Sequence, residues 1–310
     1  MDPTPAACSL RGKVAIVTGA GAGLGRAEAL ALAAAGADVV VNDVDAAGAA
    51  VVEEIEQLGG KAELVLGDVG ERATADALLA TALDRFGGLH IVVNNAGVVR
   101  DRMLFGLSDD DWDLVLRVHL RGHFLLSRGA AAHWRAQSKE TGAPVYGRIV
   151  NTSSEAFLLG PPGQANYAAA KAGIVALTVS SARALQRYGV TANAICPRAR
   201  TAMTADTFGT APAEGPDPLS TEHVAPLVAY LAGPAAQAIS GQVFVVHGGM
   251  VALLAPPTVE QRFDAQGAGW TLSDLHDSVG AHFADADPTR MFVGGDVLRL
   301  VPGTTREDRG

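Results

Sequence analysis

Cysteine and charged residues are both scarce in this chain. It has only two cysteines, Cys8 in an expected N-terminal tail and Cys196 at an expected strand end, so we predict no disulfide and a reducing, cytoplasmic setting. Charged residues make up 18% of the sequence and the net charge is −9. This acidic balance, without a basic stripe, argues against nucleic acid as a partner.

Long apolar runs and targeting signals are also missing. The alanine-rich stretch at 27–41 is interrupted by Glu28, Gly36 and Asp38, well short of a membrane span, so we expect no membrane partner. Residues 1–10 show no basic start followed by an apolar segment, so no signal peptide is expected. We also find no internal repeat and no interdomain linker.

What the 310 residues do contain is a regular alternation of apolar, β-branched runs with helical patterns. Continuous apolar strands belong in a parallel sheet that is covered on both faces. The sequence therefore predicts an α/β fold, a doubly wound, seven-stranded parallel sheet of Rossmann type in a single domain. The expected strands are Val14–Thr18, Val39–Asn42, Ala62–Leu66, Ile91–Asn94, Arg148–Thr152, Thr191–Ile195 and Val243–Val246. The expected helices lie near 24–35, 46–58, 71–86, 109–137, 164–187 and 221–232.

Two segments, 203–220 and 251–310, lie outside this alternation of strands and helices. We predict a flexible tail at 1–10, a cofactor-binding domain at 11–250 and a C-terminal extension at 251–310. The extension has one helical pattern near Leu272–Phe283, is a candidate substrate lid or interface element, and is expected to be disordered at its end, 306–310. The proline-containing stretch 203–220 reads as a mobile loop above the sixth strand.

A glycine-rich turn follows the first strand directly. It predicts close approach of a pyrophosphate to a helix N-terminus, where free N–H groups and the helix dipole favour negative charge. The spacing is Gly-x-x-x-Gly-x-Gly, and the residues expected to meet the cofactor are Gly19, Gly23, Leu24 and Gly25.

Acidic residues end the second and third strands. Asp43 can accept both hydroxyls of an adenosine ribose and would repel a 2′-phosphate, which favours NAD over NADP; a solvated acid in a turn is the alternative. Asp68 and Val69 are candidate adenine contacts, or simply a strand cap. After the fourth strand, Asn95, Ala96 and Gly97 would lie beside the glycine turn, because ligands bind at the carboxyl ends of parallel strands.

The last element is Tyr167-Ala168-Ala169-Ala170-Lys171, preceded by Ser154 at the end of the fifth strand. Residues four apart share a helix face, so the phenol and the ammonium would project together. A nearby cation is expected to lower the pKa of a tyrosine toward the range of acid–base work. With Ser154 holding a substrate oxygen, the three side chains predict proton transfer at a carbinol oxygen.

Taken in order, these motifs resemble the short-chain dehydrogenase/reductase family over roughly residues 10–250. The resemblance implies that Tyr167 is the general acid/base and that Lys171 assists it and binds the nicotinamide ribose. It further implies that Ser154 positions the substrate oxygen, that Asn94 supports the cofactor side of the sheet, and that Thr201 contacts the nicotinamide carboxamide. Family members are usually homo-oligomers, so we expect a dimer or tetramer.

Two positions depart from the family pattern. His119 stands where many members have an asparagine that anchors a relay water, and we list it as a catalytic candidate because imidazole also holds water. Arg198 stands where glycine usually follows the proline; it would meet a phosphate or carboxylate, or point to solvent.

His119 and its neighbours also resemble the (3R)-hydroxyacyl-CoA dehydrogenase units of peroxisomal multifunctional β-oxidation enzymes of type 2, of which this chain would be a free-standing bacterial counterpart. The resemblance implies oxidation of a 3-hydroxyacyl-CoA, including steroid side chains, or of a hydroxysteroid. The run 157–162 after the serine would give an apolar pocket wall that suits such a ligand, with ordinary packing beneath the active site as the alternative. Arg198 and Arg200 are the available cations for a CoA group.

We therefore predict an NAD-dependent oxidoreductase interconverting a secondary alcohol and a ketone. The alternatives are an enzyme of small alcohols or of 3-oxoacyl-carrier-protein and, from another class, a non-catalytic NAD-binding sensor. His119, His123 and His133 lack a further ligand at a suitable spacing, so no metal is expected.

Overall fold

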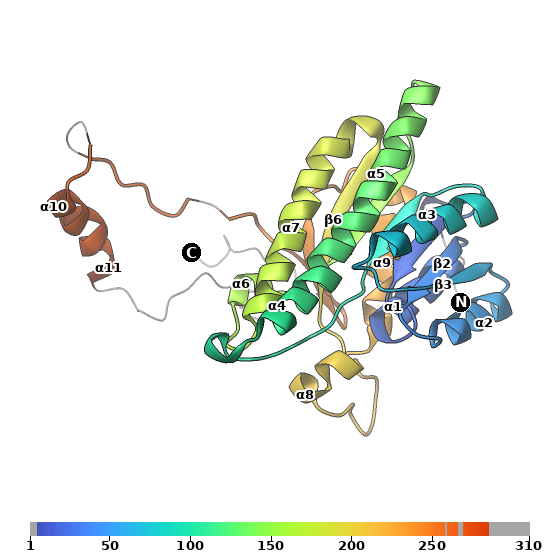
Figure 1. The fold of residues 1–310 in the computed structure, drawn as a ribbon, viewed down its shortest axis with the longest axis horizontal. Coiled ribbons are helices and arrows are strands. Elements are labelled where there is room, and N and C mark those ends of the chain that lie inside the picture. Colours follow the sequence, from blue (N-terminus) through green and yellow to red (C-terminus); the bar gives the residue numbers. More distant parts are fainter. Residues whose placement is uncertain (1–4, 258, 266–268, 285–310) are drawn as a thin grey trace. The chain divides into compact units, whose positions relative to one another are not determined.

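The computed structural model describes residues 5–257, 259–265 and 269–284. It divides into two compact units, residues 1–253 and 254–310. The first unit holds an eight-stranded sheet in the order β3-β2-β1-β4-β5-β6-β7-β8 (Figure 1). Its strands are β1 (Val14–Thr18), β2 (Asp38–Asp43), β3 (Ala62–Leu66), β4 (Ile91–Asn94), β5 (Gly147–Thr152), β6 (Val190–Pro197), β7 (Val243–His247) and β8 (Met250–Leu253).

All seven predicted strands are present and pair in parallel. The prediction of seven strands is wrong by one, because β8 pairs antiparallel with β7. His247 lies opposite Met250, so Gly248 and Gly249 form a two-residue turn, and Gly248 adopts φ +49°. A Gly-Gly pair between two apolar runs is a signal for a β-hairpin. Because β8 ends at Leu253, the sheet extends three residues into the predicted C-terminal extension.

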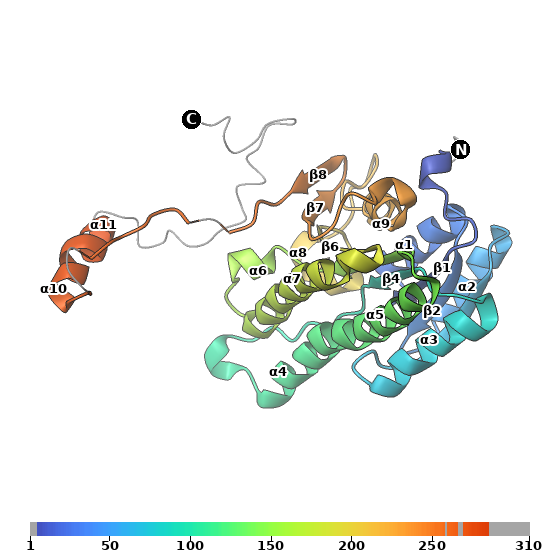
Figure 2. The ribbon, with the colours of Figure 1, turned by 90° about the horizontal axis from the view of Figure 1, so that it is seen from above.

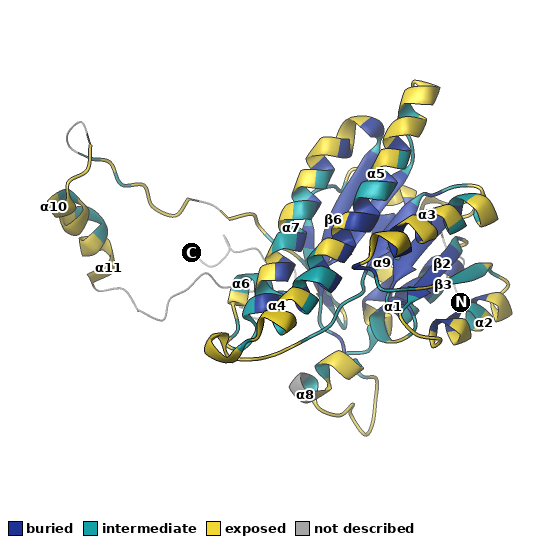
Figure 3. Ribbon diagram, in the orientation of Figure 1, coloured by how far each residue is buried: buried dark blue, intermediate teal, exposed yellow. Residues whose placement is uncertain are grey.

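Helices cover both faces of the sheet (Figure 2). Strand residues alternate in direction, so each face has its own apolar core, drawn as the buried interior in Figure 3. One face packs against α1 (Gly23–Ala34), α2 (Gly48–Gln57) and α9 (Ala225–Ala232). The other packs against α3 (Arg72–Phe86), α5 (Gly122–Thr141) and α7 (Ala165–Leu185).

The predicted helix at 109–137 consists of three parts. α4 (Asp109–Leu116) continues into a π-helical segment, η3 (Arg117–Arg121), and then into α5. A π-helical turn inside a longer helix is often found at a functional site. Here it carries His119.

The helix α7 extends through η4 (Gln186–Tyr188). By length and composition alone, the stretch 165–188 could cross a membrane. In this fold it packs on the sheet through Ala182 and Leu185, as a core helix does.

At the N-terminus, residues 1–4 lie outside the described residues, while Leu10 is fully buried and donates its N–H to the Ala35 carbonyl at 2.8 Å. The end of the predicted flexible tail is therefore part of the core. Both cysteines are free.

The second unit contains one helical run, made of α10 (Leu272–Leu275), η8 (His276–Gly280) and α11 (Ala281–Ala284). This run matches the predicted helix near 272–283. The prediction of disorder at 306–310 concerns residues outside those described.

The segment 203–220 has more local structure than a loop alone. It contains the end of η5 (Ala202–Thr204) and α8 (Ala205–Phe208). The Arg200 side chain donates to Asp217 Oδ2 at 3.0 Å and to the carbonyls of Phe208 and Gly209. Arg200 is therefore used inside the protein, whereas the sequence offered it as a cation for a CoA group.

Candidate active site

The glycine turn lies at the point where the sheet order reverses, between β1 and β4. Gly19 and Gly23 adopt φ +61° and +55°, in the left-handed region that favours glycine. A Cβ on Gly25 would lie 2.2 Å from the Gly19 carbonyl oxygen. The first turn of α1 has no side-chain cap, so its N–H groups are free to bind an anion. This backbone cradle fits the pyrophosphate of a dinucleotide.

Asp43 lies directly beside this cradle. Its Oδ2 accepts the N–H of Gly21 at 2.8 Å, and its Oδ1 accepts that of Val44 at 2.7 Å. A Cβ on Gly21 would lie 2.7 Å from Asp43 Oδ2, so glycine is required for this approach. The acid and the phosphate cradle thus form one surface, as an adenosine ribose needs.

Asn95 and Ala96, which follow β4, bind the backbone and side chain of the cradle's first residues. Both donate their N–H groups to Thr18 Oγ1, at 3.0 and 3.1 Å, and Asn95 Nδ2 donates to the carbonyls of Thr18 and Gly19. Asn94 is buried and donates to Ser127 Oγ and Asn151 Oδ1, at 3.0 and 2.8 Å. These asparagines fix the ends of β1, β4 and β5 relative to one another.

Two other predicted cofactor contacts have partners of their own. Asp68 Oδ2 pairs with Arg117 Nη1 at 2.7 Å, and its Oδ1 accepts the Gly70 N–H at 2.7 Å. Val69 is buried against Gly122. The adenine contacts of Asp68 and Val69 stay predictions.

Thr201 lies against the cradle, far along the chain from it. A Cβ on Gly23 would lie 3.3 Å from Thr201 Cγ2. Thr201 also caps η5 together with Thr204, whose Oγ1 accepts the Thr201 N–H at 2.8 Å. The fold thus brings the predicted carboxamide contact to the glycine turn.

The predicted catalytic side chains meet at the ends of β5 and α7. Lys171 is buried; its Nζ donates to the Thr152 carbonyl at 2.6 Å and lies 5.3 Å from the centroid of the Tyr167 ring. Ser154 lies near enough to Tyr167 to act on its phenol, where it works to lower the pKa. Ser154 Oγ also accepts the Ala156 N–H at 3.2 Å. The structure therefore brings Ser154, Tyr167 and Lys171 together.

The electrostatic balance of this group differs from the sequence expectation. Burial raises the pKa of Tyr167 to about 12, and the nearby Cys196 and Asp101 act in the same direction, whereas Ser154 acts to lower it. Burial also lowers the pKa of Lys171 to about 7, so its positive charge is weakened near neutrality. In the free protein Tyr167 is a neutral phenol.

His119 is buried behind Tyr167, with the rings 5.3 Å apart and perpendicular at 84°. Its Nε2 lies 2.7 Å from the carbonyl oxygen and 3.1 Å from the N–H of Val98. Its Nδ1 has no hydrogen-bond partner among the described residues. Burial holds the pKa of His119 well below its usual range, so the ring is neutral.

Two neighbours of the site were not singled out from the sequence. Asn166 is buried and holds the start of α7: its Nδ2 donates to the Arg100 and Asp111 carbonyls, and its Oδ1 accepts the Tyr167 N–H. Glu155 forms a bidentate ion pair with Arg198. Two nitrogen atoms of the Arg198 guanidinium, Nε and Nη2, are therefore bonded to an internal carboxylate. In the sequence, the departure of Arg198 from the family pattern was the signal that could have pointed to Glu155 as its partner.

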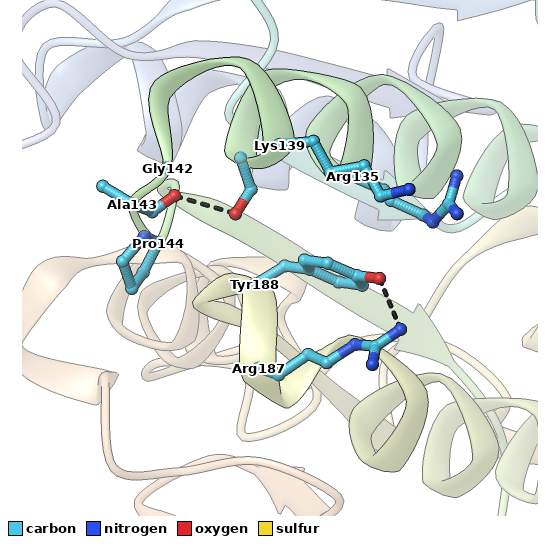
Figure 4. A pocket seen from close by; sticks show the side chains of 8 residues that line it. Arg135, Lys139, Gly142, Ala143, Pro144, Arg187 and Tyr188 are labelled. Atoms are coloured by element: carbon cyan, nitrogen blue, oxygen red, sulfur yellow. Dashed lines mark hydrogen bonds between the residues drawn. The ribbon is translucent and has the colours of Figure 1, made fainter.

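A separate pocket lies at the opposite edge of the sheet, by the starts of β5 and β6 (Figure 4). Arg135 and Lys139 of α5 and Arg187 of η4 line it, and Arg187 Nη2 donates to Tyr188 Oη at 2.6 Å. Lys139 and Arg187 are in the last turns of their helices, where cations offset the helix dipole. Among the described residues there is also no group of three or more His, Cys, Asp or Glu side chains placed to hold a metal ion.

Comparison with known proteins agrees with this geometry. The short chain dehydrogenase family model matches residues 13–211. The chain is 59% identical over 306 residues to hydroxyacyl-CoA dehydrogenase ChsB1 of Mycobacterium tuberculosis, covering 96% of both chains. It is 41% identical over 253 residues to mouse peroxisomal multifunctional enzyme type 2, covering 78% of this chain and 32% of that protein.

A solved structure shows the same architecture. The crystal structure of a short chain dehydrogenase from Mycobacterium avium matches with a TM-score of 0.82 and 43% identity, covering 92% of this chain and 99% of that one. With the glycine cradle and the Ser154–Tyr167–Lys171 group in place, these matches identify the chain as a member of the short-chain dehydrogenase family, oxidoreductases that act on CH–OH groups with a nicotinamide cofactor.

Proposed function

We propose that this protein is an NAD-dependent 3-hydroxyacyl-CoA dehydrogenase. The observation that carries the reaction is the convergence of three side chains: the half-buried phenol of Tyr167, Ser154 near it, and Lys171 Nζ 5.3 Å from the centroid of its ring. The relative with that activity in its name aligns over nearly the whole chain, which supports the acyl-CoA substrate. Asp43 beside the glycine cradle supports NAD, because its carboxylate would repel a 2′-phosphate.

The bound oxidised nicotinamide supplies the hydride acceptor. Ser154 holds the carbinol oxygen next to Tyr167, and the phenolate form of Tyr167 takes the hydroxyl proton. In the opposite direction, neutral Tyr167 gives its proton to the ketone oxygen. Lys171, fixed by the Thr152 carbonyl, stabilises the phenolate when it is charged. Because Tyr167 is protonated in the free protein, it can donate its proton in reduction as it stands, whereas oxidation requires the phenol to be ionised first.

The apolar segment after Ser154 supports a fatty acyl or steroid group. It forms α6 (Ala156–Leu159), in which Phe157 is half-buried and Leu159 is exposed. This places apolar side chains within one helical turn of the serine. We propose that they contact the acyl part of the substrate.

The test is to mix the purified protein with NAD and, in turn, a 3-hydroxyacyl-CoA, a steroid alcohol and a small secondary alcohol, following absorbance of the reduced nicotinamide. NADP is run in parallel, and 3-oxoacyl-carrier-protein is tested with NADPH. We expect the thioester with NAD to give the highest kcat/KM. Preference for the carrier protein with NADPH would replace this proposal, and tight NAD binding without turnover of any substrate would favour a sensor.

A further inference from the structure

The turn that carries Ser154 is anchored on its N-terminal side. The Ser153 N–H donates to the Ile195 carbonyl at 2.7 Å, which joins the turn to β6. Ser153 Oγ donates to the Lys171 carbonyl at 3.0 Å, which joins it to α7. These two bonds fix the chain before Ser154, so its placement also depends on what holds the chain after it.

Glu155 and Arg198 provide that second anchor. Arg198 Nε lies 2.5 Å from Glu155 Oε2, and Arg198 Nη2 lies 2.7 Å from Oε1. Only 9% of the Glu155 side chain and 16% of the Arg198 side chain are exposed. The Arg198 N–H donates to the Val246 carbonyl of β7 at 3.0 Å, so the guanidinium projects from a fixed backbone. A bidentate pair of this kind sets orientation as well as distance.

Charged and titratable groups around the pair respond to both partners. Burial raises the pKa of Cys196 on β6 and lowers that of His247 on β7. At both groups Glu155 acts to raise the pKa and Arg198 acts to lower it. The opposite charges therefore offset one another at both neighbours. Removing one partner would leave an unpaired charge in a nearly dry environment, which is costly.

We infer that Glu155 and Arg198 are a positioning pair, which holds the turn carrying Ser154 against the end of β6 so that the serine hydroxyl meets the substrate oxygen. This inference rests on the proposed function for its effect on turnover. The Glu155–Arg198 pair, which we call the clamp, is itself a property of the fold. An alternative role for Arg198, binding a phosphate or carboxylate of the substrate, would have to use Nη1, because Nε and Nη2 are bonded to Glu155.

The clamp is tested without substrate by hydrogen–deuterium exchange of the backbone amides in residues 153–160. Arg198→Met should exchange there about tenfold faster, a loss of ~1.4 kcal/mol of local stability. The matched control is Glu54→Gln, which removes the acid from the bidentate Arg26–Glu54 pair between α1 and α2. Unchanged exchange in Arg198→Met, or the same change at 153–160 in Glu54→Gln, would overturn the inference.

Turnover then tests whether the clamp acts through Ser154. Arg198→Met should lower kcat while leaving the NAD dissociation constant unchanged, and Arg198→Lys should restore part of the loss. In a Ser154→Ala background, Arg198→Met should lower kcat no further, because coupled positions are non-additive. A full additional loss in that background would contradict positioning through Ser154. If the wild-type protein turns over no substrate, the proposed function fails while the exchange result still decides the clamp.

Discussion

The imidazole of His119 meets the phenol of Tyr167 edge to face, with the ring centroids 5.3 Å apart. Its Nε2 lies within hydrogen-bond distance of both the carbonyl oxygen and the N–H of Val98 and bonds one or the other according to the tautomer, and burial keeps the ring neutral. His119 therefore supports Tyr167 by packing. For this contact, the shape of the imidazole matters more than its charge.

Substitution of His119 separates these two contributions. His119→Ala removes the wall behind Tyr167, so we expect kcat to fall about tenfold or more, the effect of ~1.4 kcal/mol lost in positioning. The shape of the pH–rate profile should be unchanged, because His119 does not titrate near neutrality. Steady-state rates from pH 5 to 9 check this. An inflection near pH 6 that disappears in the variant would show that His119 exchanges protons.

Tyr167→Phe removes the acid/base and keeps the ring. Loss of a general acid/base typically costs about 10²–10⁴ in kcat, and we expect a loss in this range. NAD binding and the melting temperature should stay near the wild-type values, because the substitution keeps the aromatic ring that packs against His119. Near-full turnover would exclude Tyr167 as the acid/base.

The high pKa of the phenol gives opposite pH dependences for the two directions. Burial raises the pKa of Tyr167 to about 12, so the fraction of phenolate grows with pH throughout the neutral and alkaline range. Oxidation needs the phenolate and should accelerate from pH 7 to 10. Reduction needs the neutral phenol and should not accelerate over the same range. Initial rates in both directions, at saturating cofactor, measure this, and parallel pH profiles would contradict the assignment.

Asp43 has two duties, and two substitutions distinguish them. Asp43→Asn removes the charge but keeps an oxygen that can accept the Gly21 N–H, so kcat/KM with NADP should rise relative to that with NAD. Asp43→Ala also removes the acceptor, so the glycine turn should loosen and affinity for both cofactors should fall. Cofactor dissociation constants for the two variants check this. An unchanged NADP/NAD ratio in Asp43→Asn would remove Asp43 from the ribose site.

Most of the fold was predictable because parallel strands and their helices have strong local signals. β1, β3 and β4 match their predicted bounds, since each is an apolar run ended by glycine or polar residues. β8 was missed because the strand is only four residues long and half of its residues are exposed. Gly248 and Gly249 were the local sequence signal for the hairpin. Register and pairing at such an edge depend on tertiary contacts that a local pattern does not contain.

The site was predictable in its residues and less so in its electrostatics. Ser154, Tyr167 and Lys171 converge as their spacing and strand-end positions imply. The pKa of Tyr167 was predicted to fall, whereas burial raises it to about 12, and burial depends on the packed interior. Arg198 was misassigned for a similar reason, since its partner Glu155 is 43 residues away in sequence.

A buried acid on α1 gives the last prediction. Glu28 is fully buried, and neither of its carboxyl oxygens has a hydrogen-bond partner within the described part of the chain. Burial raises the pKa of Glu28 to about 8, against the attraction of Lys171, from its ordinary 4.5. Between these values the folded protein keeps a proton that the unfolded chain has lost. The free energy of unfolding therefore decreases as the pH rises toward 8.

Glu28→Gln preserves the shape and removes the titration. The variant should be more stable than the wild type, with a gain that grows from pH 5 to pH 8 and then levels off, at ~2–4 °C in melting temperature for each kcal/mol recovered. Thermal unfolding at a series of pH values measures the gain, with the exposed Glu56→Gln as control, which should show no such trend. A gain that is constant with pH, or that shrinks toward pH 8, would mean that Glu28 is ionised in the folded protein, with Lys171 as the cation that offsets its burial.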